Sequence, residues 1–122
     1  MIWQVLFHFE FLKEFVEFEL AVQDEIAAHG ELLSAIGPSL KRPHADTLNG
    51  SSFANMKELR FSAYDGVWRL AYAFDPERNA ILLVAGDKSG GSSKRFYRTL
   101  IAKADARFAS HLSELKNRSA KK

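Results

Sequence analysis

The stretch MKELRFSAYDGVWRLAYAF, residues 56–74, shows the organisation of this chain most clearly. It holds two segments rich in apolar and aromatic side chains, residues 56–62 and 67–74, and a turn-like segment, residues 63–66, between them. A connection this short joins neighbouring antiparallel strands. We therefore predict a β-hairpin at the centre of the chain.

Two further strands are predicted from the sequence around this hairpin. Residues 80–86, AILLVAG, follow a short turn and are almost continuously apolar, which is typical of a strand in the middle of a sheet. Alternating apolar side chains predict a strand over residues 2–8, which must join the same sheet beside a later strand.

Apolar residues that recur at steps of three and four predict three helices. The first covers residues 10–28 and the second, a short one, covers about residues 30–37. Residues 38–55 are rich in Pro, Gly, Ser and Asn and are predicted to form a loop. The third helix is long and is capped by Ser92 or Ser93.

The order of elements is thus β-α-α-β-β-β-α. It predicts an α+β fold in which a largely antiparallel four-stranded sheet is packed by helices. A chain of 122 residues is ordinary for one domain. We place that domain over residues 1–117 and a basic tail over residues 118–122.

The charge of the chain is unevenly distributed. Residues 1–40 hold one basic and seven acidic side chains, whereas residues 41–122 hold sixteen basic and eight acidic ones. Such an asymmetry indicates that the second part meets an anion such as nucleic acid, although solvated charges on long helices would give the same pattern.

Several classes of site are excluded by what the sequence lacks. There is no cysteine, which excludes disulfides and thiol catalysis and fits a reducing cytosol. The four histidines show no metal-site spacing, so we expect neither metal nor cofactor. Charges interrupt every apolar run and the N-terminus lacks a basic leader, so we expect a cytoplasmic protein without a membrane segment.

The hairpin carries the first candidate site residues. If the loop is residues 63–66, Arg60 lies directly opposite Arg69, an arrangement that a sheet normally avoids because the charges repel. It becomes reasonable if an anion lies between them, since guanidinium groups bind phosphate in bidentate fashion. The alternative is two solvated arginines. Lys57 is three residues before Arg60 and points to the other face unless a bulge or the end of the strand brings it round.

More basic residues lie just after the strand predicted over residues 80–86. Lys88 follows that strand, beside a Gly-rich loop, and is well placed for a phosphate. Lys94, Arg95 and Arg98 put positive charge at the start of the last helix, where the helix dipole favours negative charge, which indicates an external anion. A flexible basic loop is the alternative.

Two residues are candidates for proton transfer or base contact. Tyr97 either begins the apolar stripe of the last helix or presents its ring for stacking or proton transfer. His44 is a loop histidine able to do acid–base work or to contact RNA. Metal-free RNA cleavage needs such groups: a base activates the ribose 2′-OH, cations stabilise the phosphorane, and an acid protonates the leaving oxygen.

Several segments resemble the HigB-like, phage-derived toxin branch of the RelE/ParE superfamily. They are RPHADTLNGS (residues 42–51), NMKELR (residues 55–60), Trp68-Arg69, AFDP (residues 73–76) and Gly86-Asp87-Lys88. The resemblance covers nearly the whole chain, because the order of strands and helices also matches.

The resemblance implies the toxin of a type II toxin–antitoxin pair, an mRNA interferase acting on mRNA in the ribosome. The partner in this branch is usually a helix-turn-helix antitoxin. The family's basic sheet residues carry over to Lys57, Arg60, Arg69 and Lys88. Some relatives use a tyrosine near the C-terminus, but Tyr97 begins a long helix, which leaves the general acid and base unassigned. The ParE side of the superfamily inhibits gyrase, so a non-nuclease toxin or an inactive antitoxin-binding relative is the alternative.

Overall fold

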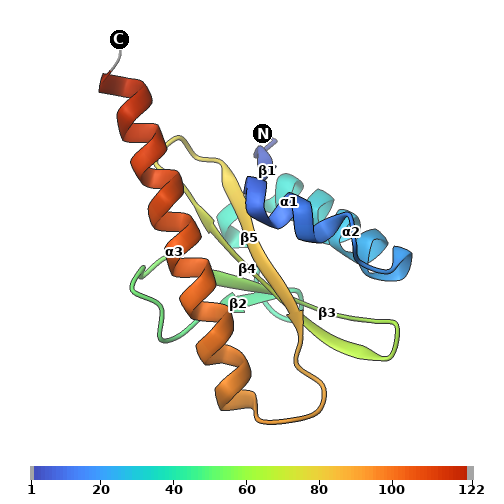
Figure 1. Ribbon diagram of the computed structural model, residues 1–122. Helices are drawn as coiled ribbons and strands as arrows, with labels where there is room; N and C mark the ends of the chain where they lie inside the picture. Colours follow the sequence, from blue (N-terminus) through green and yellow to red (C-terminus); the bar gives the residue numbers. More distant parts are fainter. Residues whose placement is uncertain (1, 121–122) are drawn as a thin grey trace.

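The computed structural model describes residues 2–120 and has a five-stranded sheet between two layers of helices (Figure 1). Two helices, α1 and α2, cover one face and the long helix α3 covers the other. The elements in chain order are β1 (Val5–Phe7), α1 (Phe9–Phe15), α2 (Leu20–Ile36), a 3-10 turn (Gly37–Ser39), β2 (Ala45–Thr47), β3 (Lys57–Ala63), β4 (Gly66–Phe74), β5 (Ala80–Asp87) and α3 (Ser93–Ala120).

The strand order is β1-β5-β4-β3-β2. Strand β1 runs parallel to β5, and the other neighbours are antiparallel. The predicted hairpin register is confirmed, because Ser62 pairs with Val67 and Arg60 pairs with Arg69. Strand β5 lies inside the sheet and its first five residues are buried, as its apolar sequence indicates. The predicted α+β class is therefore confirmed.

The sheet has five strands, and the prediction of four was wrong in this detail. The added strand β2 lies within residues 38–55, which the sequence analysis assigned to a loop. Its three residues pair with β3, with Ala45 opposite Leu59 and Thr47 opposite Lys57. Such a short strand, surrounded by Pro, Gly and Ser, has no periodicity of its own. It forms because the open edge of β3 supplies the partners.

The boundary between the first two helices was also misplaced. Helix α1 ends at Phe15, and α2 continues through Gly30 to Ile36, so the predicted second helix is the last part of α2. The chain turns before Leu20 and places the Phe18 ring against Trp68, with ring centroids 5.2 Å apart. Packing on the sheet thus overrides a helical spacing that continues across the turn, at a cost of about 1 kcal/mol for the glycine inside α2.

Alternation along the strands separates two cores. Leu59, Leu70 and Tyr72 pack against α1 and α2, whereas Met56, Ala71 and Ala73 pack under α3. By the same alternation, residues 58, 60 and 69 face α3. This side of the sheet holds the candidate site.

Helix α3 runs to Ala120, so the first residues of the predicted basic tail are helical, and Lys121 and Lys122 lie outside the described residues. The proposed domain boundary at residue 117 stays a prediction. Among residues 2–120, no helix is long and apolar enough to cross a membrane.

Candidate active site

Two arginines and one glutamate form the floor of the site. Arg60 and Arg69 lie opposite each other on β3 and β4, with side chains 24% and 9% exposed. Glu58 lies two residues before Arg60 and therefore on the same face. Arg60 Nη1 donates to Glu58 Oε2 at 2.7 Å, and Arg69 Nε lies 4.0 Å from Glu58 Oε1. The repulsion between the arginines is thus reduced by a carboxylate of the chain itself, and one positive charge is left over.

Glu58 is the most unusual member of this group. Its side chain is only 5% exposed, yet Oε1 accepts no hydrogen bond from any residue in the described part of the chain. A buried carboxylate oxygen without a donor is costly and rare. This carboxylate lies between two guanidinium groups and interacts with the Tyr97 hydroxyl.

Tyr97 is brought over this floor by the first turns of α3. Its hydroxyl oxygen accepts from Arg69 Nε at 3.2 Å. Burial raises the pKa of Tyr97, the charge of Glu58 and a hydrogen bond to it raise the pKa further, and Arg69 opposes these effects. The phenol is therefore neutral at physiological pH. Since Arg69 occupies the oxygen as a donor, the hydroxyl hydrogen is available to a neighbouring acceptor.

The group opens into a cleft of about 360 Å³ between β2, β3 and α3. Arg42 and Asp46 form part of its rim and are joined by hydrogen bonds of 2.8 and 2.9 Å. This bond lowers the pKa of Asp46, so the carboxylate stays charged. The volume lies in the range of small-molecule pockets. The lining residues are Arg42, Asp46, Thr47, Leu48, Asn49, Glu58, Arg60 and Tyr97.

Comparison with known proteins identifies the family. The family model described as phage-derived protein Gp49-like (DUF891) matches residues 13–109, which include the whole site. The chain belongs to the Gp49-like family. Its relatives include two Mycobacterium tuberculosis (strain H37Rv) proteins named as candidate toxins, HigB3 and HigB2. They are 49% identical over 63% of this chain and 42% identical over 71% of it. The matched regions span 65% and 43% of the lengths of these relatives.

A solved structure supports the fold of this Gp49-like chain. It is that of an E. coli RelE toxin variant with two arginine-to-alanine substitutions in the free state, which superposes with a TM-score of 0.60 at 14% identity. The match covers 84% of this chain and 97% of that one. The predicted resemblance to HigB-like proteins and to the RelE fold is confirmed.

The structure does not bring every predicted residue of the Gp49-like chain into the cleft. Lys57 pairs with Tyr72, a residue of the α1/α2 core, and the β3–β4 register is unbroken, so no bulge turns it round. The His44 ring packs on His29 of α2, with centroids 5.5 Å apart. Lys57 and His44 thus belong to the opposite face.

The other predicted basic residues do not line the cleft. Lys88 follows β5, and its backbone N–H donates to Val67 O at 2.7 Å, two residues along β4 from Arg69. Lys94, Arg95 and Arg98 are exposed at the start of α3, and none of them forms an ion pair within residues 2–120.

Arg95 points away from the Tyr97 cleft. It lines a separate cavity of about 370 Å³ between β5 and α3, together with Lys103. Within the described residues, no group of three or more His, Asp or Glu side chains could hold a metal ion.

Glu58 is the functional candidate that sequence reasoning missed. A glutamate between a lysine and a leucine in a strand is expected to be a solvated surface residue. The alternation of side chains along a strand could have identified it, because Glu58 is two residues from Arg60 and therefore lies on the same face of the sheet as the two arginines. Its burial depends on α3, whose position over the sheet the sequence does not specify.

Proposed function

We propose that this Gp49-like chain is the toxin of a type II toxin–antitoxin pair and that it cleaves mRNA in the cleft above Arg60 and Arg69. One observation carries the proposal: Arg60, Glu58 and Tyr97 line one cleft, and Arg69, which pairs with Arg60 across the sheet, donates to the Tyr97 hydroxyl beneath it. These are the groups required for cleavage of a phosphodiester by its own ribose 2′-OH.

The proposed step uses these groups as follows. The carboxylate of Glu58, which lines the cleft, takes the proton of the 2′-OH as the 2′-oxygen forms a bond to phosphorus. Arg60 and Arg69 stabilise the negative charge of the phosphorane. The bond from phosphorus to the 5′-oxygen breaks, and the leaving oxygen takes the Tyr97 hydroxyl proton. The products are a 2′,3′-cyclic phosphate and a 5′-hydroxyl end, and proton exchange with water restores Glu58 and Tyr97.

The neighbouring basic residues suit the rest of the RNA. Lys88 is bonded through its backbone to Val67 of β4, Lys94 and Arg98 are exposed at the start of the helix that carries Tyr97, and Arg95 lines a separate cavity between β5 and α3, where a longer strand could reach it. Exposed cations without acidic partners bind phosphates and make affinity salt-dependent. We assign Lys57 and His44 no part in the chemistry, because they belong to the other face of the sheet.

The partners follow from the same proposal. A toxin of this kind acts in the cytoplasm on mRNA at the ribosome and is held silent by a cognate antitoxin, which we take to be a helix-turn-helix protein. The names of the two mycobacterial relatives support the toxin assignment.

The direct test compares Arg60→Ala with wild type and with Arg118→Ala, an exposed arginine near the end of α3. Each protein is added to a translating extract and the mRNA is analysed by primer extension. We expect cleavage by wild type and Arg118→Ala, and a loss of about 100-fold or more in Arg60→Ala. Intact mRNA with wild type would contradict the proposal. If the same preparation stopped supercoiling by gyrase, the non-nuclease alternative would be correct.

A further inference from the structure

Helix α1 is apolar on its outer face as well as its inner face. Phe11 is fully buried on the inner side, yet Phe9, Leu12 and Val16 are 57%, 46% and 60% exposed. At 3.6 residues per turn, these three side chains lie within about 60° of one another around the helix. Leu20, 69% exposed, follows at the start of α2. We call Phe9, Leu12, Val16 and Leu20 the α1 stripe.

Single exposed apolar residues are normal on a protein surface, but four within twelve residues form a patch that marks an interaction site. Helix α1, which carries most of the stripe, belongs with α2 to the layer of helices on the face opposite α3 (Figure 1). It is thus on the other side of the sheet from the Arg60–Arg69 cleft.

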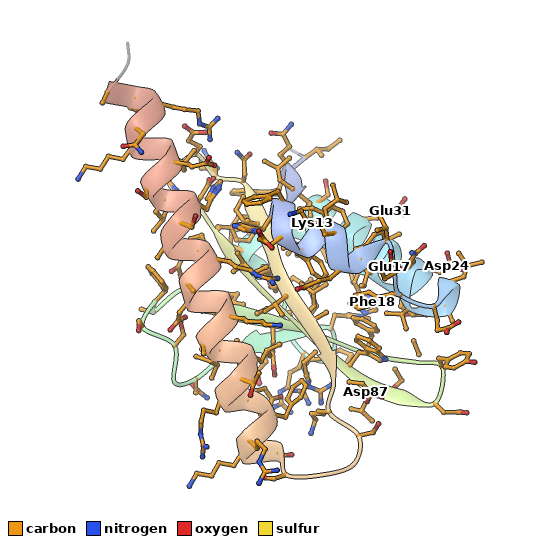
Figure 2. The ribbon with its side chains drawn as sticks, in the orientation of Figure 1. Lys13, Glu17, Phe18, Asp24, Glu31 and Asp87 are labelled. Atoms are coloured by element: carbon orange, nitrogen blue, oxygen red, sulfur yellow. The ribbon has the colours of Figure 1, made fainter. Side chains whose placement is uncertain are left out.

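Acidic side chains gather at the end of the α1 stripe where α1 leads into α2 (Figure 2). Glu17, Glu19 and Asp24 are exposed, and none of them forms an ion pair within residues 2–120. Figure 2 shows Glu17 and Asp24 at the end of the α1–α2 layer, away from α3. Lys13, the one base of residues 1–40, lies 5.4 Å over the Phe9 ring and 3.9 Å from Glu10.

This charge pattern indicates which kind of molecule can bind the α1 stripe. A second copy of the chain would bring the same acidic residues face to face, and RNA or anionic lipid would be repelled. A protein helix with a basic border around an apolar face matches both the stripe and its charges.

We propose that the α1 stripe is the docking site for an amphipathic helix of the antitoxin, with lysine or arginine on either side of its apolar face. The identification of the occupant as the antitoxin rests on the proposed function, whereas the surface and the chemistry of its partner do not.

The test titrates the full chain with two synthetic helical peptides of about 18 residues. Both have leucine on one face, and the other face is lysine in one and glutamate in the other. Binding is measured calorimetrically and mapped by amide chemical shifts. We expect the lysine peptide to bind at least about tenfold more tightly, with shifts confined to residues 5–24. Raising the salt concentration should reduce the difference in affinity between the two peptides, because salt screens their charges.

Variants give the test its controls. Leu12→Glu combined with Val16→Glu should weaken lysine-peptide binding at least about tenfold, because charge replaces the apolar contact. Tyr64→Glu, at a 72% exposed aromatic residue in the β3–β4 turn, should leave it unchanged. Glu17→Lys with Glu19→Lys should reverse the preference between the peptides. Circular dichroism checks that each variant is folded.

Equal affinity for the two peptides, or shifts on the α3 face, would overturn the proposal. So would full binding by the double variant at Leu12 and Val16. The same preparations are assayed for mRNA cleavage. The double substitution at Leu12 and Val16 should leave the cleavage activity unchanged. Loss of peptide binding with cleavage intact affects the docking proposal alone, and peptide binding without any cleavage affects the proposed function alone.

Discussion

Replacing Glu58 with glutamine removes one charge and keeps the shape of the side chain. In the proposed step the carboxylate takes the 2′-OH proton, which an amide does not do. General base catalysis contributes about 100- to 10,000-fold, so kcat for RNA cleavage by Glu58→Gln should fall by that factor.

The same substitution should strengthen RNA binding. Glu58 offsets part of the positive charge of Arg60 and Arg69. A carboxylate about 6 Å from a phosphate, at an effective dielectric constant of about 20 to 40, repels it by about 1.5–3 kcal/mol. Removing that repulsion should tighten binding about tenfold or more. Stability should fall by about 1–2 kcal/mol, because the 2.7 Å bond from Arg60 to Glu58 loses one charged partner.

The assay uses a short RNA with single-turnover kinetics for the chemical step and fluorescence anisotropy for Kd. We expect Glu58→Gln to bind RNA more tightly and to cleave it more slowly, with urea unfolding showing that the variant is folded. A variant that cleaves at the wild-type rate would refute the assignment of Glu58 as the base. A parallel loss of binding and rate would show instead that Glu58 only holds the arginines in place.

Three other changes have defined outcomes. Tyr97→Phe removes only the hydroxyl bonded to Arg69, so cleavage should fall about 100-fold or more while RNA affinity changes less than about threefold, measured by the same two assays. Arg107→Met breaks bonds of 2.6 and 2.9 Å from α3 to Glu14 of α1, and after allowance for solvent screening the free energy of unfolding should fall by about 1–2 kcal/mol at pH 7. Because Arg107 lowers the pKa of Glu14 in the folded state, the part of this stability due to the ion pair is present above the unfolded pKa of about 4.3 and is lost as the pH falls through the folded pKa. The difference between wild type and Arg107→Met in urea titrations should therefore shrink on acidification to the part due to the 2.8 Å bond from Arg107 to Leu83 O, and a difference that does not change with pH would contradict the pairing. Gly66→Ala should lower Tm, with a cost of about 1–3 kcal/mol, because its Cβ would lie 2.7 Å from Asp87 Oδ2; an unchanged melting curve would show that the turn accommodates the methyl group.

The parts of the fold that local chemistry determines were predictable. The four-residue turn fixes the register of β3 and β4, and so the opposition of Arg60 and Arg69 followed from counting residues. The apolar run of β5 placed it inside the sheet. These features depend on neighbouring residues alone.

The parts that depend on distant packing were not predictable. Nothing local ends α1 at Phe15, since the turn is fixed by the contact of Phe18 with Trp68 on β4. Strand β2 exists because β3 has an open edge. In the site, the alternation of side chains along β3 predicts that Lys57 and Arg60 point to opposite faces of the sheet. The burial of Glu58 and the contact of Tyr97 with Arg69 depend on the position of α3, which no local pattern gives.

In the proposed step the 2′-OH of the substrate is the nucleophile, and residues of the cleft supply the proton transfers. A direct test compares an RNA with the same RNA carrying a single 2′-deoxy substitution at the mapped cleavage position, in the presence of EDTA. We expect the unmodified RNA to give a 2′,3′-cyclic phosphate and a 5′-hydroxyl end, and the deoxy-substituted RNA to stay whole at that position. Cleavage of the substituted RNA there, or products with a 5′-phosphate, would contradict the proposed step.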